Sequence, residues 1–190
     1  MESNSNLTFP TETISLPSKG LFYPKDHPLR GGKVEMKYMT ASEEDILSNE
    51  NFIQSGVVLD KLIESLTMKK FDISDVLPGD KSAMLVAARI LGYGKNYKFR
   101  IRNTDVTVDL SQMKDLEMDE SIITPDGTIK YTLPETGVII EFKHLTERGY
   151  DKIAEEIEGY KKINKDNVPS VTTKLKHHIV SIDGNKDPNF

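Results

Sequence analysis

Histidine and carboxylate side chains are the groups in this sequence that could carry acid–base or metal chemistry. The chain has four histidines and 30 acidic residues but no cysteine, which excludes thiol catalysis, disulfides and thiolate metal sites. His177 and His178 are adjacent, and on a helix they would diverge by about 100°, so they cannot bind one metal ion from one face. His144 has no acidic or nucleophilic neighbour that would make it a general base. The histidines therefore predict neither a metal site nor a catalytic centre.

Phosphate-binding loops and paired carboxylates have little support either. Gly31-Gly32 lacks the Lys-Ser/Thr pair of a P-loop, and Gly92-Tyr93-Gly94 follows a predicted helix, whereas a dinucleotide fingerprint follows a strand. A cell-wall hydrolase would need two carboxylates in a cleft, for instance from among Glu117, Asp119 and Glu120. In a chain this rich in acidic residues some such pair always exists. We therefore keep the hydrolase only as the alternative to a non-enzymatic protein, and we expect no cofactor.

Composition and charge restrict the class of partner. Apolar residues make up 37% of the 190 residues, and 25 basic against 30 acidic residues give a net charge of −5. A nucleic-acid surface needs concentrated positive charge, and here Tyr97 and Phe99 alternate with Lys98 and Arg100, which places aromatic and basic side chains on opposite strand faces. No run of 18 apolar residues and no signal-peptide pattern occurs. We expect protein partners, no nucleic acid and no membrane span; the oligomeric state stays undefined.

The hydrophobic periods of the chain predict an α+β fold. Helical spacing appears after Thr40, over residues 53–68 and 81–91, and after Thr146, while residues 171–182 fit either a helix or a strand. Alternating patterns predict a strand over residues 34–38 and two hairpins over residues 97–110 and 129–142, which could merge into one small antiparallel sheet. We therefore predict this sheet of two hairpins, about four to five helices and an extended N-terminal arm. The expected divisions are the arm (1–32), a mixed α+β domain (33–168) and a C-terminal segment (169–190).

The N-terminal arm combines prolines with an apolar cluster. Prolines 10, 17, 24 and 28 space it out and prevent a helix. Leu21, Phe22 and Tyr23 stand together, which is unusual for a disordered tail. Two interpretations stay open: the arm packs on its own domain, or it docks on a partner protein through these three residues.

An acidic cluster follows the arm. Thr40 and Glu43 have the spacing of a capping box, and Glu43, Glu44 and Asp45 fall in the first turn, where the helix dipole favours negative charge. This helix start explains the cluster without a metal or acid–base site. Because the segment adjoins the arm, we include the three acidic residues with Leu21, Phe22 and Tyr23 as candidate partner contacts.

Several short motifs between Leu16 and Ser111 occur in a distinctive order. The first is Leu16-Pro17-Ser18-Lys19-Gly20-Leu21-Phe22-Tyr23-Pro24, and others lie at residues 32–47, 56–62, 79–81, 87–94 and 108–111. Together they resemble the baseplate hub subunit, or hub assembly protein, of T-even-type contractile-tailed bacteriophages. Relatives carry a Cys-x-x-Cys pair between two strands where this chain has Asn103-Thr104-Asp105, so the resemblance implies no metal site here.

The resemblance implies a role in building the central hub of the tail baseplate. The expected partners are other hub proteins, and no catalytic activity or cofactor is implied. The expected location is the host cytoplasm during assembly and, for a member that stays in the particle, the tail baseplate of the virion. Whether the protein is a structural subunit or a transient assembly chaperone is left open by the resemblance.

Overall fold

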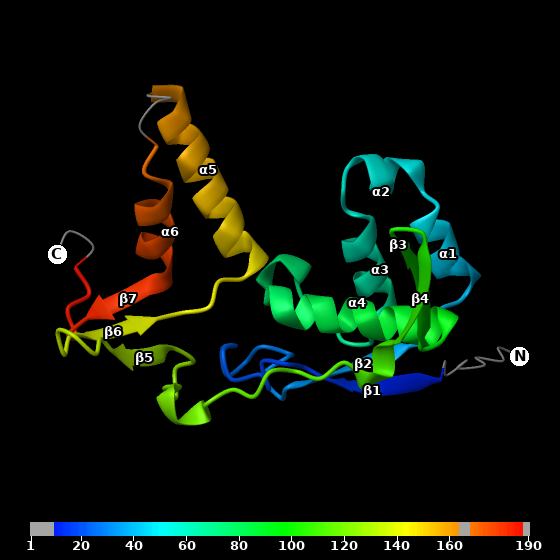
Figure 1. Cartoon of the computed structure of the whole chain (residues 1–190), viewed down its shortest axis with the longest axis horizontal. Helices are drawn as coiled ribbons and strands as arrows, with labels where there is room; N and C mark the ends of the chain where they lie inside the picture. Colours follow the sequence, from blue (N-terminus) through cyan, green and yellow to red (C-terminus); the bar gives the residue numbers. More distant parts are fainter. Residues whose placement is uncertain (1–9, 164–167, 188–190) are drawn as a thin grey trace, which may run out of the picture.

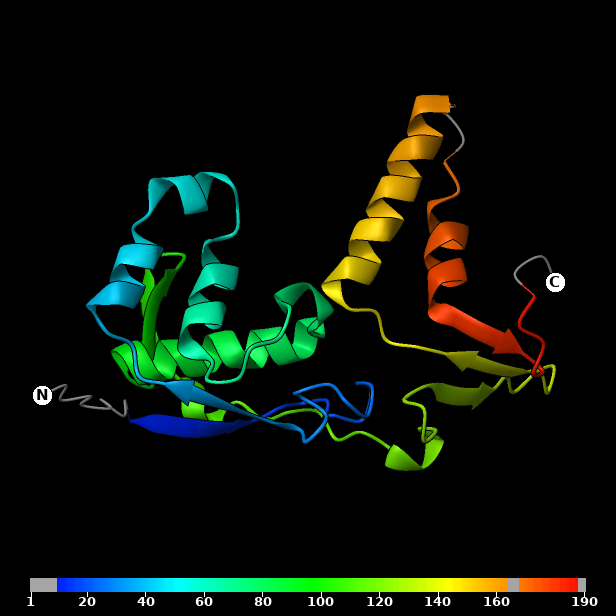
Figure 2. The same cartoon turned by 180° about the vertical axis from the view of Figure 1, so that it is seen from behind.

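The computed structural model describes residues 10–163 and 168–187 and shows an α+β protein with two lobes joined along one side (Figures 1 and 2). The N-terminal lobe contains β1 (Thr11–Ser15), β2 (Lys33–Lys37), α1 (Ala41–Leu47), α2 (Glu50–Gln54), α3 (Val58–Leu66), the 3-10 helix η1 (Ile73–Asp75), α4 (Pro78–Tyr93), β3 (Asn96–Ile101) and β4 (Thr104–Asp109). The 3-10 helices η2 (Leu110–Gln112) and η3 (Glu120–Ile122) lie on the connection. The C-terminal lobe contains β5 (Ile129–Thr132), β6 (Ile139–Phe142), α5 (Glu147–Ile163), α6 (Ser170–His178) and β7 (Ile179–Ile182).

The main hydrophobic core lies in the N-terminal lobe. The β1–β2 hairpin turns one face toward α3 and α4, because cross-strand pairs such as Ile14 with Val34 point to the same side. Met36, Ile63 and Met84 are fully buried where these elements meet. Burying one such side chain stabilises a fold by roughly 1.5–3 kcal/mol, so this core is the main source of the lobe's stability.

The two predicted hairpins form, but the expectation that they merge into one sheet is wrong. β3 and β4 remain a separate two-stranded sheet, while β6 pairs with β5 on one side and β7 on the other. Residues 110–128 separate the hairpins and carry them to different lobes (Figure 1). The C-terminal hairpin gains its third strand from the segment after residue 169, which therefore contributes to this sheet.

Six α-helices are present in the described residues, compared with the four to five that were expected. The helix predicted over residues 53–68 is broken in two, because Gly56 adopts a positive φ of 75° that ends α2 before α3 begins. The undecided segment over residues 171–182 contains both structures, as α6 runs directly into β7. Also, α4 starts at Pro78, so Asp80 lies inside its first turn and is not its N-cap.

The turns that follow β3 and β7 have the backbone conformations that tight turns need. Arg102 and Asn103 both have positive φ and form the two-residue turn of the β3–β4 hairpin. Asp183 and Gly184 have positive φ after β7, as their turn requires. Within the described ranges, no helix is long and apolar enough to span a bilayer.

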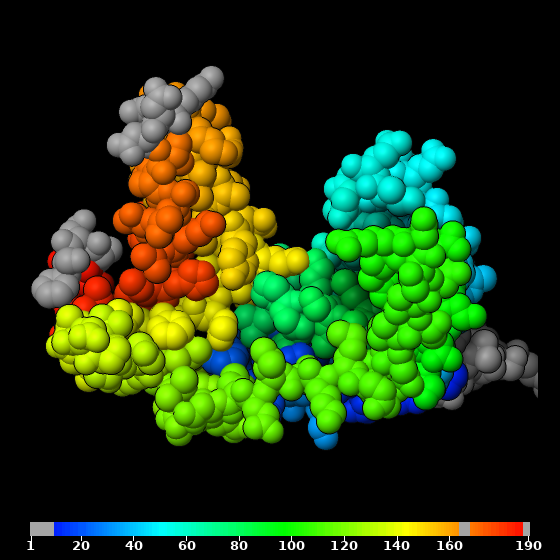
Figure 3. Space-filling view, viewed as in Figure 1, coloured from blue at the N-terminus to red at the C-terminus, as the bar shows by residue number. Residues whose placement is uncertain are grey.

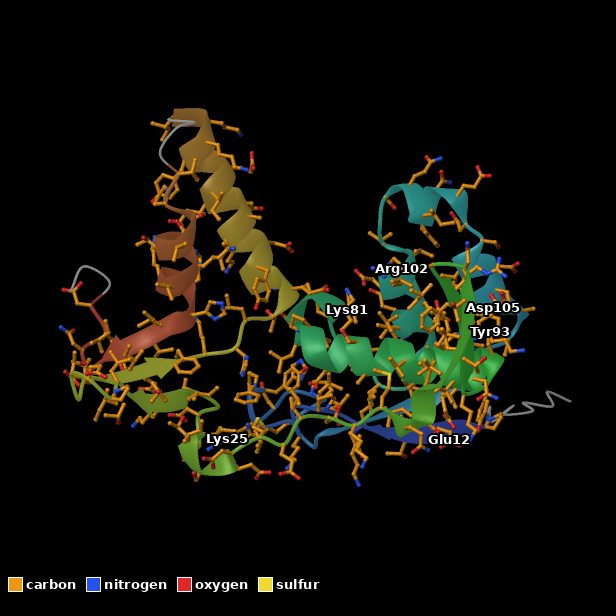
Figure 4. All side chains as sticks on the ribbon, viewed as in Figure 1. Glu12, Lys25, Lys81, Tyr93, Arg102 and Asp105 are labelled. Atoms are coloured by element: carbon orange, nitrogen blue, oxygen red, sulfur yellow. The ribbon has the colours of Figure 1, made fainter. Side chains whose placement is uncertain are left out.

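The lobes are held together by charged and aromatic contacts. Lys81, at the end of α4 nearest α5, bridges Asp60 of α3 and Glu147 of α5 (Figure 4). Arg148 of α5 donates hydrogen bonds to Asp75 at 2.8 Å, as well as to Asp72 and Ser74 of the η1 segment. Above this joint a notch separates the lobes in the space-filling view (Figure 3). The joint is therefore mostly polar, unlike the core of the N-terminal lobe.

Candidate protein-interaction surfaces

Tyr23 of the predicted docking cluster lies in the core, not on the surface. Its side chain is 3% exposed, and its ring stacks on His27 with centroids 4.5 Å apart. The hydroxyl donates to Asp80 Oδ2 at 2.7 Å and accepts from the backbone N–H of Leu77 at 3.0 Å. Burial raises the pKa of Tyr23 far above its usual value, despite the hydrogen bond from Leu77. Tyr23 thus stays a neutral donor and anchors the arm to the first turn of α4.

Asp80 collects the hydrogen bonds of the arm. Its carboxylate is almost fully buried and accepts from Ser18 twice, at 3.0 Å from the backbone N–H and at 2.6 Å from the hydroxyl. With the Tyr23 hydroxyl, these bonds satisfy the carboxylate, which also sits in the favourable first turn of a helix. The described residues contain no buried side-chain polar atom without a partner. This network therefore has a structural role and leaves no group free for chemistry.

Phe22 and Leu21 lie where the lobes meet. The Phe22 ring contacts the His144 ring edge-on at 4.5 Å between centroids, and burial, followed by the nearby His178 charge, lowers the pKa of His144. The carbonyl of Leu21 accepts from Arg30 at 2.9 Å. Both side chains are half-buried. The described part of the arm, residues 10–32, thus packs on its own protein, which favours the first of the two interpretations of the arm.

Glu43 of the acidic cluster is buried and satisfied. The capping box forms, with the Thr40 backbone N–H donating to the Glu43 carboxylate at 2.8 Å. Lys37 and Ser65 also donate to this carboxylate, at 2.8 and 2.6 Å. Burial alone would raise the pKa of Glu43, but the hydrogen bonds from Lys37, Ser65 and Thr40 outweigh it and lower the pKa to about 2. Glu43 therefore joins α1 to β2 and α3.

Acidification should reveal this contribution of Glu43. A carboxyl whose pKa is lower in the folded protein than in the unfolded chain stabilises the fold at pH values above its unfolded-chain pKa of 4.5. This stabilisation disappears as the pH falls toward 2. We expect Glu43→Gln to be less stable than the wild type at pH 6, with the gap shrinking on acidification to pH 3. Urea unfolding at both pH values measures the gap. A gap independent of pH would contradict the assignment, because other carboxylates titrate equally in both proteins.

The other two acidic candidates remain on the surface. Glu44 accepts a hydrogen bond from the Tyr93 hydroxyl at 2.6 Å, and this bond is the first cause of the raised pKa of Tyr93. Asp45 is exposed and is not buried by any other element. The structure thus separates the cluster into one structural residue and two surface residues. Only Glu44 and Asp45 stay available as partner contacts.

The β3–β4 hairpin exposes an apolar face. Tyr97 pairs with Val108 and Phe99 with Val106, so these four residues and Ile101 share one side of the hairpin. Tyr97 and Ile101 are 43% and 52% exposed. The aromatic and basic side chains lie on opposite faces, as the alternation predicted, but the apolar face is partly open to solvent. In Figure 1 the hairpin rises from the end of α4, and among the described strands β3 and β4 pair only with each other.

A second exposed apolar surface lies on the connection between the lobes, which we call the strap (residues 113–119). Leu116 is 96% exposed and Met113 is 62% exposed. In the described structure, residues 114–118 lie outside every helix and strand, and their backbone makes no turn hydrogen bond. Acidic side chains alternate with these apolar ones at Asp115, Glu117 and Asp119. The sequence contained one signal for this exposed segment. It has a single Leu among acidic residues, with neither a helical nor a strand period.

The carboxylates considered for a hydrolase have ordinary structural partners. Asp119 accepts from the Ser121 hydroxyl and backbone N–H, and these bonds lower its pKa. Glu120 pairs with Lys19, and Glu117 is exposed. A general acid needs a raised pKa, so this arrangement offers no support for glycosidic cleavage.

Histidine and carboxylate groups give no metal site in the part of the chain that the structure describes. No group of three or more such residues is close enough to hold an ion there. His177 instead forms a hydrogen bond with Glu156 at 2.8 Å, and His178 with the backbone carbonyl of Lys143 at 3.1 Å.

A repeated sequence motif could have predicted that the arm is part of a folded hairpin. Leu16-Pro17-Ser18-Lys19-Gly20 starts the connection of the β1–β2 hairpin, and Leu133-Pro134-Glu135-Thr136-Gly137 forms that of the β5–β6 hairpin. Gly20 and Gly137 have positive φ values of 76° and 72°. Each hairpin then leads to a helix that begins after a threonine, Thr40 or Thr146. The recurrence indicates that the first motif, like the second, belongs to a folded hairpin.

Comparison of the chain with protein-family models, with curated proteins and with solved structures finds no match.

Proposed function

We propose that this protein is a non-enzymatic component or assembly factor of the central hub of a contractile-tailed bacteriophage baseplate, acting through protein–protein contacts. The observation that carries the mode of action is the group of large apolar side chains exposed on the projecting hairpin and on the strap. Other exposed apolar side chains are scattered over the described chain, which is normal, but Tyr97, Ile101 and Val108 share one hairpin face, and Met113 and Leu116 lie close together on the strap. The resemblance over residues 16–111 supplies the identity of the assembly.

The energetics favour binding to a protein surface. Aromatic anchors such as Tyr97, which is held beside Arg89 by a cation–π contact of 5.6 Å, gain most when a partner removes water from them. The arm and Glu43, by contrast, already have their partners inside the molecule. The contact surface we propose is therefore the hairpin face and the strap, with Glu44 and Asp45 of α1 as the remaining candidates from the sequence.

Co-expression with the other hub proteins of its own phage tests the proposal. We expect the tagged chain to co-purify with a hub protein, and Ile101→Asp to reduce the recovered partner at least tenfold without changing the melting temperature, because Ile101 is exposed. Thr107→Asp is the matched control, since Thr107 lies on the opposite face of the same hairpin. Capture of no hub protein by the wild type would refute the proposal.

Mass spectrometry of finished particles separates the two roles that the proposal includes. A chain that joins the hub and persists in the particle is a structural subunit. A chain that joins the hub but is absent from particles is a transient chaperone that works in the host cytoplasm.

A further inference from the structure

Strand β1 has an open edge. The bonds from Leu16 N–H to Gly32 O and from Tyr38 N–H to Pro10 O fix the alternation of the antiparallel pair. Even-numbered residues of β1 therefore bond to β2, and the backbone N–H and C=O groups of Thr11, Thr13 and Ser15 point away from it. No other strand pairs with β1 in the described residues.

The opposite edge of this hairpin is closed. Met36 of β2 forms a bridge with Thr67, and the backbone N–H of Met68 donates to Glu35 O at 3.0 Å. Natural sheets usually protect an exposed edge with a bulge, a lysine or a proline within the strand. From Thr11 to Ser15, β1 has a regular register and contains neither a bulge, a lysine nor a proline, and its one charged side chain is Glu12. Its open edge is thus suited to pairing with another strand.

A groove runs along the open edge. Two adjoining hollows of about 560 and 670 Å³ share Ser15, Pro17 and Asp115 in their walls. The smaller hollow lies between β1 and α4, with Val86 and Ile90 forming its apolar wall. We call this smaller hollow the edge groove. A strand added to β1 would direct alternate side chains toward α4, as Ile14 and Val34 already do, and these side chains would enter the groove.

The charge of the edge groove indicates what it accepts. Its only charged lining residues in the described chain are Glu12 of β1 and Asp115 of the strap, both acidic. Figure 4 shows Glu12 at the lower margin of the lobe, on β1. Apolar walls between two carboxylates complement a strand with alternating apolar residues and a lysine or arginine near one end.

We infer that the open edge of β1 and the edge groove bind an extended segment of a partner protein, which adds as a third strand and presents a basic side chain at the Asp115 end of the groove. This inference rests on the proposed function, because it describes how a hub partner is held. Main-chain hydrogen bonds supply affinity in such complexes, while the pockets for alternate side chains supply selectivity.

Two variants of the co-expressed chain test the inference. Thr13→Pro removes an outward N–H that only an added strand uses, and proline is tolerated at such edge positions. We expect it to weaken binding of the captured hub partner about tenfold or more, whereas Thr13→Val, which keeps the N–H, should bind within about twofold of the wild type. Asp115→Lys reverses a charge on an exposed side chain and should weaken binding severalfold.

Hydrogen exchange of the wild-type complex gives a readout that does not depend on the folding of a variant. The amides of Thr13 and Ser15 should exchange rapidly in the free protein and be protected in the complex. Unchanged exchange at these amides, or wild-type affinity of Thr13→Pro and Asp115→Lys, would overturn the inference while leaving hub binding established. Dimerisation of the isolated chain with protection of the same amides would also overturn it, by making a second copy the occupant. If the wild type captures no hub protein, the proposed function fails and the inference falls with it.

Discussion

Replacing Gly20 with Ala is expected to destabilise the protein by about 3 kcal/mol or more. Gly20 has a φ of 76°, and a Cβ there would lie 2.2 Å from the carbonyl oxygen of Arg30 and 2.6 Å from the backbone nitrogen of Gly32. Both contacts are with backbone, which cannot turn aside as a flexible side chain does. The chain at Arg30 to Gly32 would have to move, and Arg30 would lose its hydrogen bonds to the carbonyls of Leu21 and Tyr23.

Thermal unfolding of Gly20→Ala measures this effect. For a chain of this length, 3 kcal/mol corresponds to a lowering of the melting temperature by roughly 6–12 °C. Gly56→Ala is the matched control: its φ is 75° at the C-terminal end of α2, but nothing lies within 4 Å of the added Cβ, so the substitution should cost only the left-handed backbone conformation, about 1 kcal/mol. Equal losses in the two variants would show that the close approach of Gly20 to residues 30–32 is unimportant.

Replacing Asp80 with Ala is expected to cost about 3–5 kcal/mol, because it leaves three donors without an acceptor. Those donors are the N–H and hydroxyl of Ser18 and the hydroxyl of Tyr23, all in buried residues. The variant also removes a negative charge from the first turn of α4. The arm would detach from α4 and expose the Tyr23 ring to water.

Urea unfolding of Asp80→Ala, compared with Asp119→Ala, tests this expectation. Asp119 also accepts hydrogen bonds from a serine hydroxyl and backbone N–H, but it is exposed, so its replacement should cost about 1 kcal/mol or less. Similar losses for the two variants would mean that burial of the Asp80 network adds nothing. Near-wild-type stability of Asp80→Ala would show that the arm is not held by this network, and the arm would again be a candidate docking segment.

Features that depend on neighbouring residues could be predicted from the sequence. The capping box at Thr40 and Glu43, the hairpin within residues 97–110 and the helix after Thr146 all formed as expected. The break at Gly56 shows the limit of this approach. A helical apolar period extends across this glycine, and only the backbone shows that its positive φ separates α2 from α3.

The candidate contact residues were predicted less well, because exposure depends on residues far away in sequence. Tyr23 has the aromatic side chain of an interface anchor. It is held inside the protein because Asp80, 57 positions later, accepts a hydrogen bond from its hydroxyl. In the sequence Glu43 is an ordinary first-turn carboxylate. Only the fold brings Ser65 of α3, 22 positions away, to donate a hydrogen bond to it. Conversely, Tyr97 and Ile101 alternate like core residues, but both remain about half exposed on their side of the hairpin.

The sequence by itself determined the α+β class, most of the helices and strands and their turns, since backbone preference and hydrophobic period act within a few residues. Only the tertiary structure decided that the hairpins stay apart, that β7 completes the sheet of the C-terminal lobe, that the arm is internal and that β1 keeps an open edge. The physical reason is that strand pairing and burial join residues distant in the chain, and each pattern can be satisfied by several partners until packing selects one.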